Sequence, residues 1–256
     1  LGKNVSINLG KVDAILNETE MVKGEVFKAT ERIKVYVLEV KDTPKGPRIS
    51  VSRTHPDLVK RLFESEVAEV KDGTVEIKAI AREAGSRTKI AVKSNDQNVD
   101  PVGACVGLNG ARVNSIVNEL RGEKIDIINW DDNPAYLIEN ALSPAKVICV
   151  VADEESREAQ VIVPDYQLSL AIGKEGQNAR LAARLTGYKI DIKSETQARE
   201  MGLFEELGLD YQEDGGYDDY ESDYQEDGEA EYQEDYQDDY QEDYQDDGLE
   251  ADSQEK

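Results

Sequence analysis

Two short glycine motifs are the residues of this chain best suited to contact a ligand. Gly107-Leu108-Asn109-Gly110 and Gly173-Lys174-Glu175-Gly176 each lie between two segments whose apolar residues recur at helical spacing. The flanking helices should pack inward and leave the loops at the surface. Glycine has no Cβ, so it permits a tight reversal and lets another backbone approach closely. The amides that open the second helix favour negative charge. Each loop therefore suits a sugar–phosphate backbone.

The two loops occupy equivalent places in an internal repeat. The offset is 66 residues at the glycines and 65 at a shared Lys-Ile-Asp-Ile strand. Each copy predicts the order α-β-β-α-α-β. Besides the short helix before each loop, the predicted elements are 57–66, 74–82, 87–93, 111–121 and 124–128, and then 135–141, 146–152, 158–163, 177–185 and 189–193. One Gly-x-x-Gly alone is usually an ordinary helix connection. Two in this arrangement match the KH module, whose loop holds a single strand over about four nucleotides.

Basic residues gather near these loops. Residues 166–193 carry a net charge of +3 and residues 44–61 a net charge of +4, although a solvated face explains most such clusters. The first loop has no base inside it, so Arg112 supplies the nearest charge. The predicted RNA-binding residues are Gly107, Leu108, Asn109, Gly110, Arg112, Gly173, Lys174, Glu175, Gly176, Asn178, Arg180 and Arg184.

The two ends of the chain differ from this middle part. Residues 3–9, 11–16, 32–41 and 48–53 alternate apolar and polar side chains, which predicts four antiparallel strands of a small all-β barrel that lacks at least one strand. Residues 210–256 hold 22 acidic residues and one lysine, a net charge of −21, and leave −4 for residues 1–209. Six Tyr-Gln-acid-Asp repeats and almost no aliphatic residues predict a disordered tail there.

Composition excludes several classes of protein. No apolar run is long enough for a transmembrane helix, and no signal peptide is recognisable, so we expect a cytoplasmic protein without membrane contact. Cys105 and Cys149 lack metal-ligand spacing, and His55 is the only histidine. We therefore expect no metal, no cofactor and no enzyme activity. A phosphodiesterase using acidic metal ligands is the competing class. The chain begins with leucine, so we expect a fragment or a processed product.

Several further motifs carry a specific resemblance. These are Arg53-Thr-His-Pro, Arg82-Glu-Ala-Gly-Ser-Arg, Asp100-Pro-Val-Gly-Ala-Cys-Val-Gly, Gly122-Glu-Lys-Ile-Asp-Ile, Leu142-Ser-Pro-Ala and the run from Gln167 to Arg184. With them, residues 1–200 resemble the NusA family of bacterial transcription elongation factors. The resemblance implies an S1-type OB barrel and two KH domains that bind nascent RNA. It also implies effects on pausing, intrinsic termination and antitermination.

The same resemblance implies partners and boundaries. RNA polymerase would be contacted mainly through an N-terminal domain that is missing here, as is the first barrel strand. Other transcription elongation factors are expected partners, and the chain is expected to be a monomer. The predicted domains are 1–54 (S1 barrel), 55–134 (first KH), 135–200 (second KH, both of type II) and 201–256 (acidic tail). A KH protein of ribosome assembly or RNA processing is the alternative function. His55 and Trp130 are interpreted as packing residues.

Overall fold

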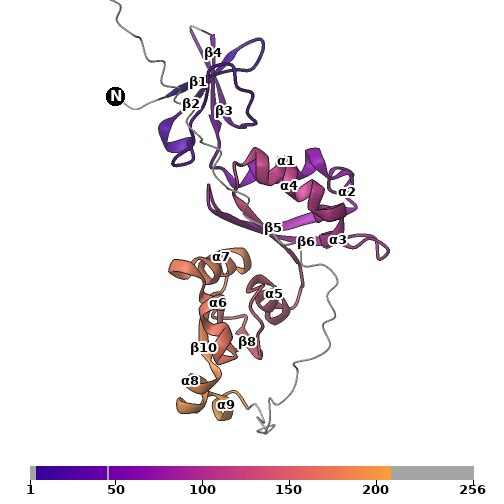
Figure 1. Cartoon of the computed structure of the whole chain (residues 1–256), viewed down its shortest axis with the longest axis vertical. Helices are drawn as coiled ribbons and strands as arrows, with labels where there is room; N and C mark the ends of the chain where they lie inside the picture. Colours follow the sequence, from indigo (N-terminus) through magenta and orange to yellow (C-terminus); the bar gives the residue numbers. More distant parts are fainter. Residues whose placement is uncertain (1–3, 45, 209–256) are drawn as a thin grey trace, which may run out of the picture. The chain divides into compact units, whose positions relative to one another are not determined.

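The computed structural model describes residues 4–44 and 46–208. The first part of these residues forms a four-stranded sheet (Figure 1). Its strands are β1 (Val5–Asn8), β2 (Asp13–Leu16), β3 (Tyr36–Thr43) and β4 (Gly46–Ser52). Their order in the sheet is β1-β2-β4-β3. Alternation along β2 and β4 builds a small buried core from Ala14, Leu16, Ile49 and Val51.

Two expectations for this sheet are corrected. The strands are not all antiparallel, because β2 pairs with β4 in parallel. The connection from residue 17 to residue 35 carries the chain past β2, and the β3–β4 hairpin then brings β4 back beside it. The predicted strand 32–41 begins only at Tyr36, because side chains bind the backbone before it. The N–H of Lys34 donates to Glu119, and its carbonyl accepts from Arg53. Within the described residues the sheet does not close into a barrel.

The middle part of the chain is an α/β unit. Its sheet has the order β5-β6-β7, with β5 antiparallel to β6 and β6 parallel to β7. Helices α1 and α4 lie together on it (Figure 1), and the core between them includes Leu58, Phe63, Ile90 and Ile116. The elements are α1 (Pro56–Glu66), α2 (Ala68–Lys71), β5 (Val75–Glu83), β6 (Arg87–Ser94), α3 (Pro101–Val106), α4 (Ala111–Glu119) and β7 (Lys124–Asn129).

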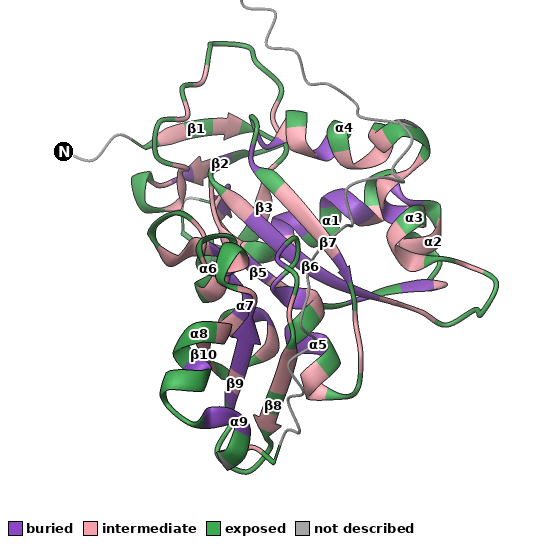
Figure 2. Cartoon of the chain, turned by 60° about the horizontal axis from the view of Figure 1, so that its bottom comes forward, coloured by how far each residue is buried: buried purple, intermediate pink, exposed green. Residues whose placement is uncertain are grey.

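A second α/β unit repeats this order. Its sheet reads β10-β9-β8, again with one antiparallel and one parallel pair. The elements are α5 (Pro134–Ala141), β8 (Cys149–Asp153), β9 (Glu158–Val163), α6 (Leu168–Ile172), α7 (Gln177–Thr186) and β10 (Lys189–Ser194). The predicted duplication of an α-β-β-α-α-β unit is therefore confirmed. The central strands β6 and β9 are the most buried in each unit (Figure 2).

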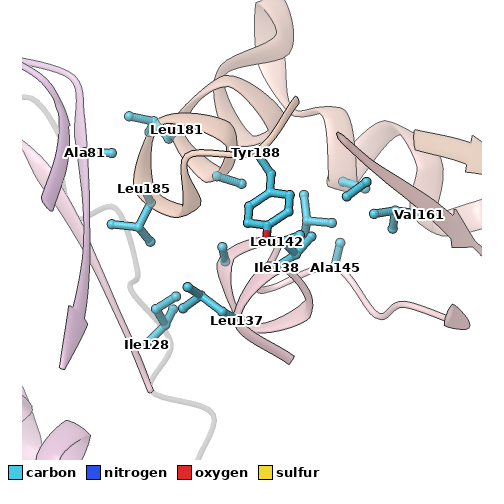
Figure 3. Packing of buried hydrophobic residues seen from close by; sticks show 14 of the residues in the cluster. Ala81, Ile128, Leu137, Ile138, Leu142, Ala145, Val161, Leu181, Leu185 and Tyr188 are labelled. Carbon is cyan, nitrogen blue, oxygen red and sulfur yellow. The ribbon is translucent and has the colours of Figure 1, made fainter. Parts of the chain in front are cut away.

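Besides the first unit's own core, a second hydrophobic cluster, the shared core, contains residues of both α/β units. Ala81 and Ile128 of the first unit belong to the same buried cluster as Leu137 and Leu185 of the second (Figure 3). Apolar burial of this kind is the main favourable term in folding and association. The two units are consequently joined by packing as well as by the short connection between β7 and α5.

The described chain continues beyond the second unit. Helix α8 (Glu195–Glu200) begins with a capping box in which Ser194 and Gln197 satisfy each other's backbone N–H groups. Helix α9 (Leu203–Glu206) follows, and its Leu203 and Phe204 are buried. Residues 201–208 of the segment predicted as tail thus contain a helix. The remainder of that segment, residues 209–256, lies outside the described residues.

Candidate nucleic-acid interface

The two Gly-x-x-Gly loops have the same backbone conformation. Gly107 and Gly173 have φ/ψ of 74°/174° and 76°/172°. The third residues, Asn109 and Glu175, lie at 50°/32° and 54°/26° in the left-handed region. The last glycines have φ of 73° in both copies. Because Leu-Asn and Lys-Glu share little chemistry, the common conformation comes from the glycines and the flanking helices.

The first glycine of the second loop is required by sterics as well as by its dihedral angles. A Cβ added to Gly173 would lie 2.8 Å from the backbone nitrogen of Asn178 and 2.8 Å from its Cβ. The loop therefore folds back against the start of α7. Helix α7 is amphipathic, with Leu181, Ala182 and Leu185 buried, and it ends at Gly187 in the left-handed conformation. This packing fixes where the loop lies.

The tips of both loops are exposed. Leu108, Asn109, Lys174 and Glu175 all lie at the surface, and Leu108 is 85% exposed. Lys174 forms no ion pair within residues 4–44 and 46–208. The first loop thus offers an apolar side chain and an amide, whereas the second offers a positive charge beside a negative one.

Two of the predicted RNA-binding residues, Arg112 and Asn178, bind backbone and side-chain groups of the protein next to the loops. Arg112 donates to the carbonyl of Ala104 in α3 (2.6 Å) and pairs with Glu69 of α2 (3.1 Å). Asn178 is buried, and its Nδ2 donates to the carbonyls of Leu142 (2.9 Å) and Ala171 (3.1 Å). Both side chains are engaged with protein groups that position the helices on either side of a loop.

Arg180 and Arg184 contact the first α/β unit. The Nε of Arg180 donates to Glu83 Oε1 (2.6 Å), and Arg184 Nη1 lies 3.4 Å from the same oxygen. Gln177 Nε2 donates to the other carboxylate oxygen of Glu83 (2.9 Å). Hydrogen bonds from Arg180 and Gln177 lower the pKa of Glu83 to about 2. Glu83 is therefore a charged partner of two arginines, a role that sequence reasoning missed because the residues are distant along the chain.

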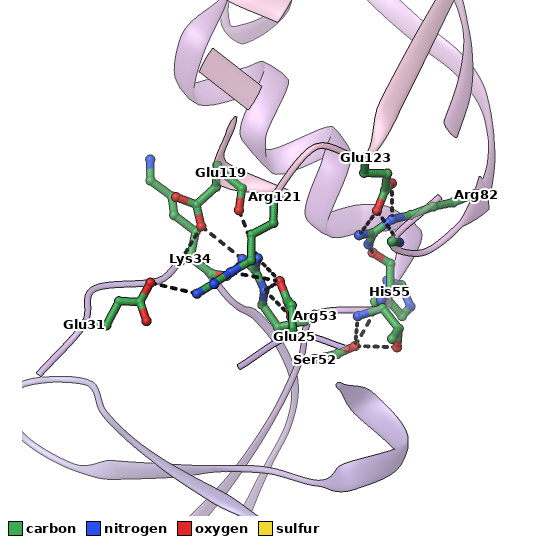
Figure 4. Close-up of polar contacts among 12 residues, drawn as sticks. Glu25, Glu31, Lys34, Ser52, Arg53, His55, Arg82, Glu119, Arg121 and Glu123 are labelled. Atoms are coloured by element: carbon green, nitrogen blue, oxygen red, sulfur yellow. Dashed lines mark hydrogen bonds and ion pairs between the residues drawn. The ribbon is translucent and has the colours of Figure 1, made fainter. Parts of the chain in front are cut away.

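A second polar cluster joins the N-terminal sheet to the first α/β unit (Figure 4). The buried guanidinium of Arg53 pairs with the buried carboxylate of Glu25 and donates to the carbonyl of Glu119 (2.9 Å). Arg82 forms a two-pronged pair with Glu123, both hydrogen bonds being 2.8 Å long. Burial alone would raise the pKa of Glu123, but the hydrogen bonds and charge of Arg82, with hydrogen bonds from Thr88 and the Gly85 N–H, together hold the pKa below its usual value. Arg53, which adds to the basic charge of residues 44–61, is an internal residue.

His55 and Trp130 have structural contacts, as predicted. His55 caps α1 by accepting from the N–H of Asp57 (3.1 Å) and stacks on Tyr36 with ring centroids 4.6 Å apart. Trp130 packs against the shared core and donates to Asp132 (2.9 Å).

The described residues contain no group of three or more His, Cys, Asp or Glu side chains that could hold a metal ion. In the same part of the chain, no helix has the length and apolarity needed to span a bilayer. Both cysteines are free, and burial raises the pKa of the Cys105 thiol to about 11. The two loops offer exposed backbone and charge at the surface.

The duplicated α-β-β-α-α-β unit with its paired loops defines a protein with tandem KH domains. Family models agree: residues 53–130 match the NusA-like first KH domain and residues 134–200 the NusA-like second KH domain. The chain belongs to the NusA family.

Curated relatives support this assignment. Proteins named "Transcription termination/antitermination protein NusA" are 61% identical over 202 residues in Bacillus subtilis and 58% identical over 208 residues in Halalkalibacterium halodurans. These matches cover 79% and 81% of this chain and 54% of each relative. The Mycobacterium bovis protein of the same name is 55% identical over 184 residues, which is 72% of this chain and 53% of that protein. The chain spans about half the length of the curated relatives it matches.

Proposed function

We propose that this chain is a non-catalytic RNA-binding module that contacts nascent single-stranded RNA and modulates pausing, intrinsic termination and antitermination. The observation that carries the proposal is the pair of exposed Gly-x-x-Gly loops with one shared backbone conformation. The name of the relatives refers to transcription termination and antitermination, which supports the process in which the binding is used.

The loops bind RNA through their backbone. A phosphate approaches the glycines closely because no Cβ is in its path, and it lies at the start of a helix, where negative charge is favoured. Lys174 adds a positive charge in the second domain, and Leu108 adds apolar contact in the first. Arg112 and Asn178 act by holding the loops, since their side chains already bind protein groups.

The N-terminal sheet belongs to an S1-type OB barrel in this proposal. The parallel pairing of β2 with β4 and the order β1-β2-β4-β3 support a Greek-key barrel with one more strand between β1 and β3. A cavity of ≈ 860 Å³ lined by β1, Met21 and residues 25–33 supports an open side next to β1. The domains then run over 1–54, 55–134, 135–200 and 201–256.

Membership of the family supports the wider parts of the proposal. The protein acts in the cytoplasm as a monomer, and its partners are nascent RNA, RNA polymerase and other transcription elongation factors. Polymerase is contacted mainly through a further N-terminal domain. Capture of RNA polymerase by the chain with and without such a domain tests this arrangement.

The RNA-binding proposal is tested with K174D/E175D, which replaces the only base of the second loop by a carboxylate, keeps the negative charge at residue 175 and removes no core residue. We expect most of the affinity for a single-stranded RNA to disappear while the melting temperature is unchanged. The salt dependence of binding should also fall, by about 0.7 in log K against log salt for each phosphate that the variant no longer binds.

The control is K11D, which makes the same change in net charge at an exposed lysine in the β1–β2 turn. Retained affinity in K174D/E175D would contradict the proposal. Turnover of labelled RNA in the presence of magnesium would contradict its non-catalytic part.

A further inference from the structure

Three polar side chains of α7 reach across the domain boundary to one place on the first KH domain. Gln177, Arg180 and Arg184 are spaced i, i+3 and i+7, so they share one stripe of the helix. All three contact Glu83, at the end of β5. Gln177 also donates to the hydroxyl of Ser86 (2.8 Å), in the turn that follows. The β5–β6 turn of the first domain is thus bound to the helix that follows the second loop.

This stripe is not a property of the KH unit itself. At the offset of 66 residues, the first domain has Ala111, Asn114 and Asn118 in the equivalent positions of α4, and none of them is charged. The two arginines of this stripe occur only in the copy of the helix that contacts Glu83. The residue types of the stripe are therefore explained by the contact with Glu83.

The contact continues into the second loop. Arg180 donates through Nη1 to the carbonyl of Glu175 (3.0 Å), while its Nε and Nη2 bind the carboxylate of Glu83. Glu175 is the loop residue in the left-handed conformation. One guanidinium therefore links the carboxylate of the first domain to the backbone of the second domain's loop. A planar guanidinium with several fixed donors suits such a link.

We propose that Glu83 is a positioning residue that holds the second Gly-x-x-Gly loop in register with the first, so that one RNA strand can bind both. This inference rests on the proposed RNA-binding function. A strand that binds both loops gains affinity because the second contact is intramolecular, and the gain depends on the geometry of the two sites. Glu83 contributes to that geometry without itself touching RNA.

Removal of the Glu83 carboxylate should leave the tandem folded. The two domains are also joined by their shared hydrophobic core. In addition, the buried Lys89 of β6 donates to the carbonyl of Ser143 in the second domain (2.8 Å). These contacts do not involve the loop, so a Glu83 variant separates the position of the loop from the stability of the fold.

The experiment compares E83A with the unaltered protein on two single-stranded RNAs. One has about 12 nucleotides and can reach both loops, and the other has about five, close to the span of one KH domain. We expect E83A to bind the longer RNA about tenfold more weakly and the shorter one within about twofold of the unaltered protein. In an R180A background, E83A should weaken binding little further, because both variants remove the same link.

The matched control is E158A, which removes one carboxylate from an exposed pair with Lys189 (2.9 Å) in the second domain and makes the same change in charge. It should leave both affinities unchanged. A parallel decrease in affinity for the two RNAs, or no decrease for the longer one, would overturn the inference.

A readout without RNA separates this inference from the proposed function. Amide hydrogen exchange at residues 173–176 should be faster in free E83A than in the unaltered protein, with exchange in β6 and β9 unchanged. Equal exchange at the loop would refute positioning by Glu83. Absence of RNA binding by the unaltered protein would instead refute the proposed function.

Discussion

Gly173 is the position at which a single methyl group should do most damage to the second loop. Its φ/ψ of 76°/172° lies in a region that is essentially restricted to glycine, which costs other residues about 1–3 kcal/mol. The added Cβ would also lie 2.8 Å from the backbone nitrogen of Asn178. Relieving that overlap by shifting the start of α7 costs about 1–3 kcal/mol more. Gly173→Ala should therefore destabilise the protein by about 2–6 kcal/mol.

Gly187→Ala is the matched control. Gly187 ends α7 with a similar φ of 75°, but no atom lies within 4 Å of the position of its Cβ. At Gly187, an alanine is destabilising only because it must adopt the left-handed conformation, which costs about 1–2 kcal/mol. The two variants thus make the same chemical change at the two ends of one helix, with and without a steric overlap.

Urea unfolding followed by circular dichroism measures the free energy of unfolding of both variants, and thermal melting gives a second measure of their stability. At about 2–4 °C per kcal/mol, the melting temperature should fall by roughly 4–24 °C for Gly173→Ala and by roughly 2–8 °C for Gly187→Ala. RNA affinity should fall only for Gly173→Ala, at temperatures where both variants remain folded. Equal destabilisation by the two substitutions would refute the close approach of the loop to Asn178.

Further predictions concern the buried and paired charges. Because the pKa of Glu83 is about 2 in the folded protein against an ordinary 4.5, its stabilising contribution should be complete above pH 4.5 and disappear as the pH falls towards 2. In urea unfolding, E83Q should therefore show a weaker dependence of stability on pH than the unaltered protein, and the same dependence in both would contradict this prediction. Arg53→Met should cost about 3–5 kcal/mol because it leaves the buried Glu25 with only a longer pair to Arg121 (3.6 Å), and E25Q in the same chain should recover part of that stability. Cys105, with a pKa of about 11, should resist alkylation at pH 8 until urea is added, and rapid labelling of the native protein would be the contrary result.

Features with a local signal could be predicted from the sequence. The duplicated unit, the loops and most element bounds follow from apolar periodicity and from glycines whose conformations no other residue adopts easily. The alternation of apolar residues predicts the strand Glu158–Val163 to the residue. Element ends were missed where side chains replace backbone pairing, as at Lys34, or where the chain turns early, as at Arg121 with its φ of 56°.

The roles of the arginines could not be predicted, because each depends on a partner far along the chain. Arg180 binds Glu83 at a separation of 97 residues, and Arg53 binds Glu119 at a separation of 66. A net charge counted over a stretch of sequence includes such arginines as if they were all free to bind phosphate. The parallel pairing of β2 and β4 was missed for a similar reason, since it depends on which strands meet after a long connection.

The two copies of the unit have diverged in what holds their loops. In the first domain, Arg112 ties the start of α4 to Glu69 and Ala104 of the same domain. In the second, Asn178 stands at the equivalent position and ties the start of α7 to Leu142 and Ala171, again of the same domain. Within the described residues, only the second loop has an additional link across the boundary, from the Glu175 carbonyl through Arg180 to Glu83. Each domain can therefore hold its own loop, and the proposed role of Glu83 is to set the second loop, with its Lys174, relative to the first.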